Sequence, residues 1–229
     1  MLRKLIAALG FGTAVTLAVA APPYSPYSDS AANDIYNLLF CDLAASFQPS
    51  SGQPPTDWQA VLFKEPADVA ALTALASSST TEGRVRVLAY NRLRALGIAV
   101  PKGILLGVVV EVGLDGGLDT LAAFVDGGVR YINQTGKMVI FEGAVADIQP
   151  LVKNLIQSST TLVARLSPSQ RGRQPPPPKG NLRLTFLVSD GFYGGEGSFG
   201  AMQRNEMSAP VVASAQNLLL KVVELGTAR

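Results

Sequence analysis

The sequence predicts an α+β domain built around one antiparallel sheet, and three observations support that prediction. Four short apolar runs separated by glycine-containing turns lie between Ile104 and Gly143, which is the pattern of a β-meander. A fifth, alternating run lies at residues 181–189, after a long amphipathic stretch, and further helical patterns occupy residues 30–97. We therefore expect about five strands with helices packed on one face, preceded by an N-terminal helical region.

Residues 1–21 have the layout of a secretory signal peptide: two basic residues, a mostly apolar stretch, and small residues at 18–20 at cleavage-site spacing. We expect an exported or periplasmic protein. The alternatives are an uncleaved N-terminal membrane anchor, which would be the chain's only contact with a membrane, and a leader on a cytoplasmic protein. Residues 22–29 are rich in proline and are expected to form an extended leader.

Residues 30–229 are expected to form a single α+β domain, with a helical part at 30–97 and a sheet part at 104–229. Removing Arg3 and Lys4 from the 19 basic residues leaves 17, which balance the 17 acidic residues. Phosphate neutralisation dominates nucleic-acid affinity, so a neutral chain without a basic stripe is not expected to have a nucleic-acid partner.

The chain contains no histidine and one cysteine, Cys41. This composition excludes Ser-His-Asp and Cys-His catalysis, His-ligated metal sites, thiolate clusters and intrachain disulfides. We expect neither a metal ion nor a cofactor. No basic group is adjacent to Cys41 in the sequence, so we interpret this residue as a buried small hydrophobe rather than a nucleophile.

The helical part is expected to contain helices at residues 30–47, 66–76 and 82–96, with residues 57–64 forming either a strand or a helical turn. Gly97 marks the end of the third helix. That helix carries four arginines, which we interpret as a solvated face in preference to an anion-binding surface.

The meander supplies four strands, at residues 104–114, 118–125, 129–134 and 137–142. The first run is almost continuously apolar, as in a strand covered on both faces. A long helix at 145–166 can return the chain so that the fifth strand pairs at an open edge of the meander. The last three segments are expected to be a proline-rich semi-rigid spacer at 167–180, a glycine-rich loop at 190–200 and a terminal helix at 208–225.

Six residues are candidates for binding a ligand. Glu111 lies in an apolar strand, so if buried it needs a partner, and Arg130 is the expected one. Polar and aromatic residues of the glycine-rich loop form the best pocket-like cluster, although a turn with an exposed aromatic is the simpler alternative. The candidates are Glu111, Arg130, Tyr131, Asp190, Tyr193 and Glu196.

Two further patterns are weaker indications of a site. Residues 195–200 match G-x-G-x-x-G, but no βαβ unit is completed around them, and dinucleotide binding requires one. Glu111, Asp115 and Asp119 could form a carboxylate group for a hard cation or for acid–base work, but their spacing lacks the alternating oxygen ligands of a calcium loop.

Three segments carry a resemblance: YNLLFCD at 36–42, LGVVVEVGLDGGLDTLAAFVDGGVRYINQTGKMVIFE at 106–142 and LTFLVSDGFYGGEG at 184–197. In these segments the chain resembles a family of uncharacterised bacterial proteins of unknown function. The resemblance covers most of the chain after the leader and implies a bacterial source. It carries over no functional residue.

The missing histidine, metal ligands and nucleophile favour a non-enzymatic binding or protein-interaction module, whose protein or small-molecule partner is unknown. The alternative is a carboxylate-based hydrolase using Glu111, Asp190 or Glu196. A role as a toxin, immunity or secretion accessory protein is a third option. Convergence of two of those carboxylates in a concave pocket, with raised pKa values, would favour the hydrolase.

Overall fold

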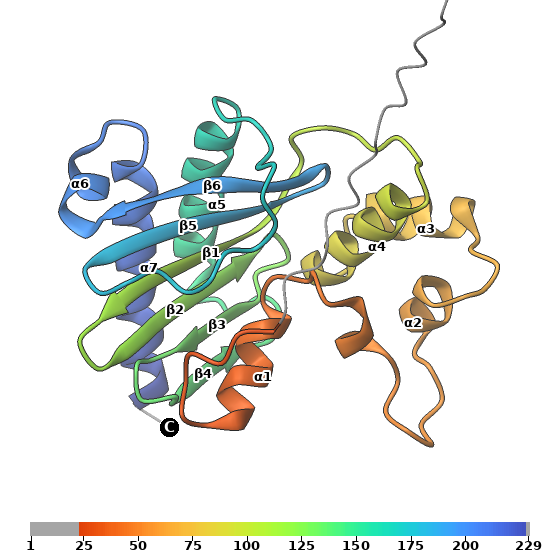
Figure 1. Ribbon diagram of the computed structural model, residues 1–229, viewed down its shortest axis with the longest axis horizontal. Helices are drawn as coiled ribbons and strands as arrows, with labels where there is room; N and C mark the ends of the chain where they lie inside the picture. The colour runs from red at the N-terminus through yellow and green to blue at the C-terminus, as the bar shows by residue number, and fades with distance from the viewer. Residues whose placement is uncertain (1–22, 228–229) are drawn as a thin grey trace, which may run out of the picture.

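Six strands form one antiparallel sheet in the order β4-β3-β2-β1-β5-β6 (Figure 1). The computed structural model describes residues 23–227, so the predicted signal peptide at 1–21 lies outside the described residues. The strands are β1 (Leu105–Leu114), β2 (Gly117–Phe124), β3 (Val129–Ile132), β4 (Met138–Phe141), β5 (Asn181–Val188) and β6 (Gly191–Ser198).

The first four strands confirm the predicted meander. Each pairs with the next in antiparallel register, and Gly127 and Gly136 adopt positive φ angles of 94° and 84° in two of the turns. Strand β1 is the free edge of this meander until β5 returns to it, with Val108 opposite Phe186. The expected pairing of the fifth strand at an open edge is therefore confirmed.

The expected number of strands was one too low. Residues 190–200 do not form a loop, because most of them belong to β6, which pairs with β5 along eight residues. Gly194 has a φ of 149°, and a Cβ at this position would overlap the carbonyl oxygen of Leu184. The glycines that permit this close pairing also remove the side-chain alternation by which a strand is recognised.

The structure has seven α-helices and one 3₁₀-helix within residues 23–227. The predicted helix at 30–47 ends at residue 38, because Cys41 has a φ of 54° and the chain turns there. The segment 57–64 is helical at residues 57–62, and α6 was not expected. The elements are α1 (Ser30–Leu38), η1 (Ala44–Phe47), α2 (Asp57–Leu62), α3 (Val69–Ser77), α4 (Gly83–Ala95), α5 (Gln149–Val163), α6 (Phe199–Arg204) and α7 (Ala209–Thr227).

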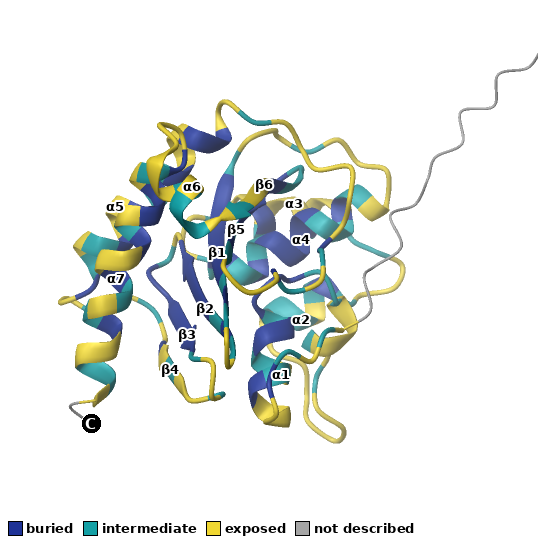
Figure 2. Ribbon diagram, turned by 60° about the vertical axis from the view of Figure 1, so that its left-hand side comes forward, coloured by how far each residue is buried: buried dark blue, intermediate teal, exposed yellow. Residues whose placement is uncertain are grey.

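Helices cover both faces of the sheet, so the expectation of one covered face was wrong (Figure 2). We call the side under α5, α6 and α7 the α7 face; its core includes Val108, Leu121, Leu184 and Phe186. We call the side under α1 to α4 the α4 face; its core includes Val109, Ala122, Phe124, Ile132 and Leu187. Successive side chains of β1 point to opposite faces, and its unbroken apolar run needs cover on both.

The proline-rich connector, residues 167–180, crosses the α4 face instead of extending as a spacer. Arg183 on β5 donates hydrogen bonds from Nη1 to the carbonyl oxygens of Gln174, at 3.2 Å, and Pro175. The Gly180 amide donates to the Gly113 carbonyl oxygen at 2.8 Å, and a Cβ at Gly113 would overlap the carbonyl groups of the prolines above it. We call residues 167–180 the strap.

Candidate functional site

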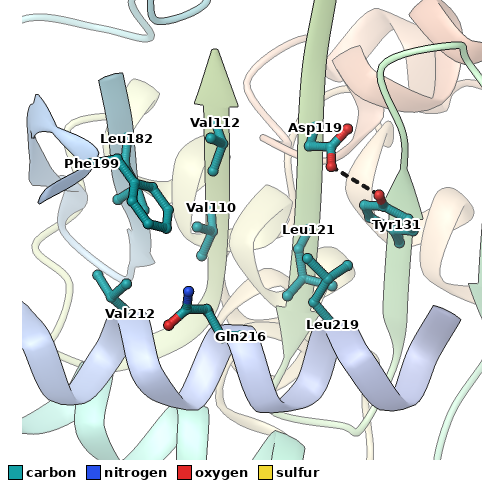
Figure 3. A pocket seen from close by; sticks show the side chains of 11 residues that line it. Val110, Val112, Asp119, Leu121, Tyr131, Leu182, Phe199, Val212, Gln216 and Leu219 are labelled. Atoms are coloured by element: carbon teal, nitrogen blue, oxygen red, sulfur yellow. Dashed lines mark hydrogen bonds between the residues drawn. The ribbon is translucent and has the colours of Figure 1, made fainter. Parts of the chain in front are cut away.

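A cavity of about 210 Å³ lies on the α7 face, between the sheet and helix α7 (Figure 3). Strands β1, β2, β3 and β5 form one wall, and α6 and α7 form the other. Most of the lining is aliphatic or aromatic, and its central members are Val110, Leu121, Leu182, Phe199, Val212 and Ala215. The short side chain of Ala215 leaves room beneath α7 that a longer side chain would occupy.

One end of this cavity is polar. Tyr131 on β3 and Asp119 on β2 point to the α7 face, and the Tyr131 hydroxyl donates to Asp119 Oδ2 at 2.9 Å (Figure 3). The other oxygen of Asp119 accepts a hydrogen bond from the backbone N–H of Gln134 at 2.7 Å. Burial, and then the adjacent carboxylate, raise the pKa of Tyr131, so its phenol stays neutral and acts as the donor.

Helix α7 adds the amide of Gln216 to the same cavity. Gln216 is exposed, and its side chain extends from the helix towards the sheet (Figure 3). Among the described residues that line this cavity, Asp119 is the one charged side chain, and no lysine or arginine contributes to the lining. The cavity is therefore an apolar space with a carboxylate and a phenol at one end.

A buried polar network occupies the opposite, α4 face. Glu111 is 1% exposed and accepts a hydrogen bond from the Tyr36 hydroxyl at 2.7 Å. Sheet register places Arg183 beside it and Glu196 beyond, and Arg183 forms ion pairs with both, at 3.9 Å from Glu111 Oε2. Burial raises the pKa of Glu111 to about 7, against the smaller opposing effects of the Tyr36 hydrogen bond and the arginines.

The expected pair of Glu111 with Arg130 was wrong. Both side chains lie on the α4 face, but Arg130 is in register with Ala122 and Val109, one cross-strand row away from Glu111. Arg130 instead forms ion pairs with the carboxylates of Glu142, at 2.8 Å, and of Glu82, at 3.6 Å. Two charged side chains on one face of a sheet pair only if they also lie in the same or an adjacent cross-strand position, and Glu111 and Arg130 lie in different rows.

The strap places a second arginine in the polar network. The Arg173 side chain is 2% exposed, and its Nε lies 3.2 Å from Asp42 Oδ2. Its Nη2 donates to Asn37 Oδ1 at 2.8 Å, and its guanidinium carbon lies 4.7 Å from the centre of the Phe40 ring. The rings of Tyr24 and Tyr36 complete an aromatic enclosure. Sequence reasoning missed this anchor; the one signal was an arginine within a proline-rich segment.

The predicted cluster forms only in part: Asp190 and Tyr193 are hydrogen-bonded to each other, and Glu196 lies apart from both. Tyr193 belongs to the core of the α7 face, whereas Glu196 joins the network on the α4 face. Asp190 stabilises the turn between β5 and β6, because it accepts the Tyr193 hydroxyl at 3.0 Å and the Gly103 amide at 3.1 Å. Of the three hydrolase candidates, Glu111 and Glu196 therefore share one arginine, and Asp190 lies apart from them.

A second pocket is lined by Trp58 and neighbouring side chains of α2, α3 and α4. None of the three carboxylates lines this pocket or the cavity under α7. Asp115 forms an ion pair with Lys179, so Glu111, Asp115 and Asp119 have separate partners. Within residues 23–227, no group of three or more histidine, cysteine, aspartate or glutamate side chains is arranged to hold a metal ion. Cys41 is buried, as expected, and burial raises the pKa of its thiol.

Comparison of the chain with family models, curated proteins and solved structures found no match. None of the helices between residues 23 and 227 combines the length and the apolar character that a membrane crossing requires.

Proposed function

We propose that this protein is a non-enzymatic binding module that holds a small apolar molecule in the cavity between α7 and the sheet. The observation that supports this proposal is a cavity of about 210 Å³ whose walls are almost entirely apolar. An apolar cavity of about 150 Å³ stays dry and takes up benzene. Scaling from that case, this cavity accommodates a ligand of roughly eight non-hydrogen atoms.

Two matched substitutions on α7 test the proposal. Leucine in place of buried Ala215 fills the cavity, whereas leucine in place of Ala213, which is exposed on the same helix, leaves it open. Titration calorimetry with n-hexanol should detect binding to the natural chain and to Ala213→Leu, and lose it in Ala215→Leu. Binding that survives Ala215→Leu, or that is absent from all three proteins, would contradict the proposal.

The carboxylate-based hydrolase remains the second candidate, and one observation favours it. A carboxyl with a pKa of about 7 can exchange a proton at neutral pH, as a general acid or base must. The burial of Glu111 argues against it, because the side chain is already enclosed by Tyr36 and Arg183. Hydrolysis of a panel of small esters that disappears in Glu111→Gln, with n-hexanol binding intact, would support the hydrolase instead.

We also propose that the protein is exported and that residues 1–21 are removed. The described residue with hydrogen bonds that lies nearest to that segment is Tyr24. Its backbone N–H donates to the Asn37 side-chain oxygen at 3.0 Å, and its carbonyl oxygen accepts from the Asn37 side-chain nitrogen at 2.8 Å. Cleavage before residue 22 therefore leaves these contacts in place. Mass spectrometry of the protein from its native host should show a chain without the segment. An intact Met1 on soluble cytoplasmic protein would exclude export.

A further inference from the structure

We infer that the molecule held in the cavity carries a hydrogen-bond-donating cationic head, so that the site selects a primary amine with an apolar body. This inference rests on the proposed function, because it assigns the head group of a ligand whose body fills the same cavity. Three properties of the polar end support it: its charge, the direction of its hydrogen bonds and the apolar walls beside it.

The charge at this end is negative. Asp119 is the charged residue of the described lining, and no lysine or arginine of that lining neutralises it. Its two oxygens accept one hydrogen bond each, from Tyr131 and from the Gln134 amide. A carboxylate can accept about four hydrogen bonds, so lone pairs remain for a donor on the ligand.

The hydrogen-bond direction gives the same preference. The Tyr131 hydroxyl donates its hydrogen bond to Asp119, so its oxygen can only accept a hydrogen bond from a ligand. An ammonium head supplies three donors and a positive charge, and both groups can accept from it. A carboxylate head supplies neither, and it would stand next to Asp119 with the same sign of charge.

The apolar walls strengthen this discrimination. Charges interact several times more strongly at the edge of a protein than in bulk water. Asp119 is partly exposed, so the effect is smaller than in a sealed site. We therefore expect the amine to bind about tenfold more tightly than the alcohol of the same chain length, and the carboxylate to bind most weakly.

The test compares n-hexylamine, n-hexanol and hexanoate by titration calorimetry with the full chain, near neutral pH and at low salt. The three probes share one body and differ in the head. The expected order of affinity is amine, then alcohol, then carboxylate. Rising ionic strength should reduce the advantage of the amine, because that advantage is electrostatic.

Two variants test whether Asp119 is the residue that causes the preference for the amine. Asp119→Asn keeps an oxygen for the Gln134 amide but removes the charge, so the amine should lose its advantage over the alcohol. Tyr131→Phe removes one of the two acceptors but keeps the carboxylate charge, so the advantage should become smaller and still persist. Circular dichroism of both variants verifies that the sheet is intact, and the Tyr131→Phe result remains decisive if Asp119→Asn does not fold.

The outcomes separate the two proposals. If none of the three probes binds, or if binding persists in Ala215→Leu, the proposed cavity function is wrong and this inference falls with it. If n-hexanol binds and responds to Ala215→Leu, but hexanoate equals or exceeds n-hexylamine, the cavity function stands and the amine preference is wrong. An amine advantage that survives in Asp119→Asn, or that disappears in Tyr131→Phe, would also overturn the preference.

Discussion

Glu111 shows how one residue can be predicted correctly and its environment incorrectly. A glutamate in an apolar strand predicts a buried carboxyl that needs a partner, and Glu111 is buried. The partners are Tyr36 and Arg183, which are far from it in sequence and reach it through α1 and β5. Nothing in the local pattern around residue 111 distinguishes these partners from Arg130.

The raised pKa of Glu111 predicts a pH dependence of stability. Its folded-state pKa is about 7 and its ordinary value is 4.5, so between these pH values the folded chain holds a proton that the unfolded chain has released. Stability from this group is therefore greatest below about pH 4.5 and falls as pH rises towards 7, by about 3 kcal/mol in total.

Urea unfolding at about pH 5 and about pH 8 measures this loss. Glu111→Gln should reduce the difference between the two conditions by about 2.5 kcal/mol, because glutamine does not titrate and part of the total effect already lies below pH 5. Glu224→Gln, at an exposed position on α7, is the control and should keep the natural difference. An unchanged pH difference in Glu111→Gln would show that this carboxyl does not control the effect.

At the scale of elements, one buried cation, Arg173, holds the strap against α1 and the residues that follow α1. Arg173 is enclosed by aromatic rings and by Asp42, and burial raises the pKa of Asp42 despite the nearby guanidinium. The two side chains neutralise each other in a region with little water. Removing one of them leaves the other as an unpaired buried charge, which costs more than the pair contributes.

A double-mutant cycle tests this arrangement. Arg173→Met should lower the free energy of unfolding by about 3 kcal/mol, because Asp42 is left without its counter-ion. Adding Asp42→Asn should recover part of that loss, so the two changes are not additive. Urea unfolding of the four proteins gives the coupling energy. Additive effects would mean that the ion pair does not hold the strap.

The elements also show which patterns are visible in a sequence. Strands β1 to β5 carry alternating or continuous apolar runs, and all five were predicted close to their observed bounds. Strand β6 was missed because glycines at 194, 195 and 197 have no side chains to alternate. The sequence predicts a spacer at the strap because polyproline segments have no internal hydrogen bonds. In the structure the strap's hydrogen-bond partners come from β1 and β5.

At the scale of the whole molecule, one strand carries the signal that both faces of the sheet are covered. The run at 104–114 is apolar at nearly every position, which indicates cover on both faces. The helical part at 30–97 supplies the second cover. The cavity under α7 had no signal of this kind, because it depends on how Ala215 and its neighbours pack against β1 and β2, and local periodicity does not encode that fit.

The two cores share one sheet, so neither part of the domain should fold alone. A fragment of residues 98–229 exposes the apolar α4 face, including Val109 and Phe124, and leaves Glu111 without Tyr36. Each large side chain returned to water costs about 2 kcal/mol, which soon exceeds the usual net stability of a domain. The fragment should therefore give the narrow amide dispersion of an unfolded chain in a two-dimensional NMR spectrum.

The chain of residues 23–229 is the matched control and should give a dispersed spectrum and one cooperative unfolding transition. It lacks the predicted signal peptide but keeps the described helices and strands that cover both faces. A dispersed spectrum and cooperative unfolding in the 98–229 fragment would show instead that the α7 core sustains the sheet without α1 to α4. The helical part would then be a separate unit docked on the α4 face.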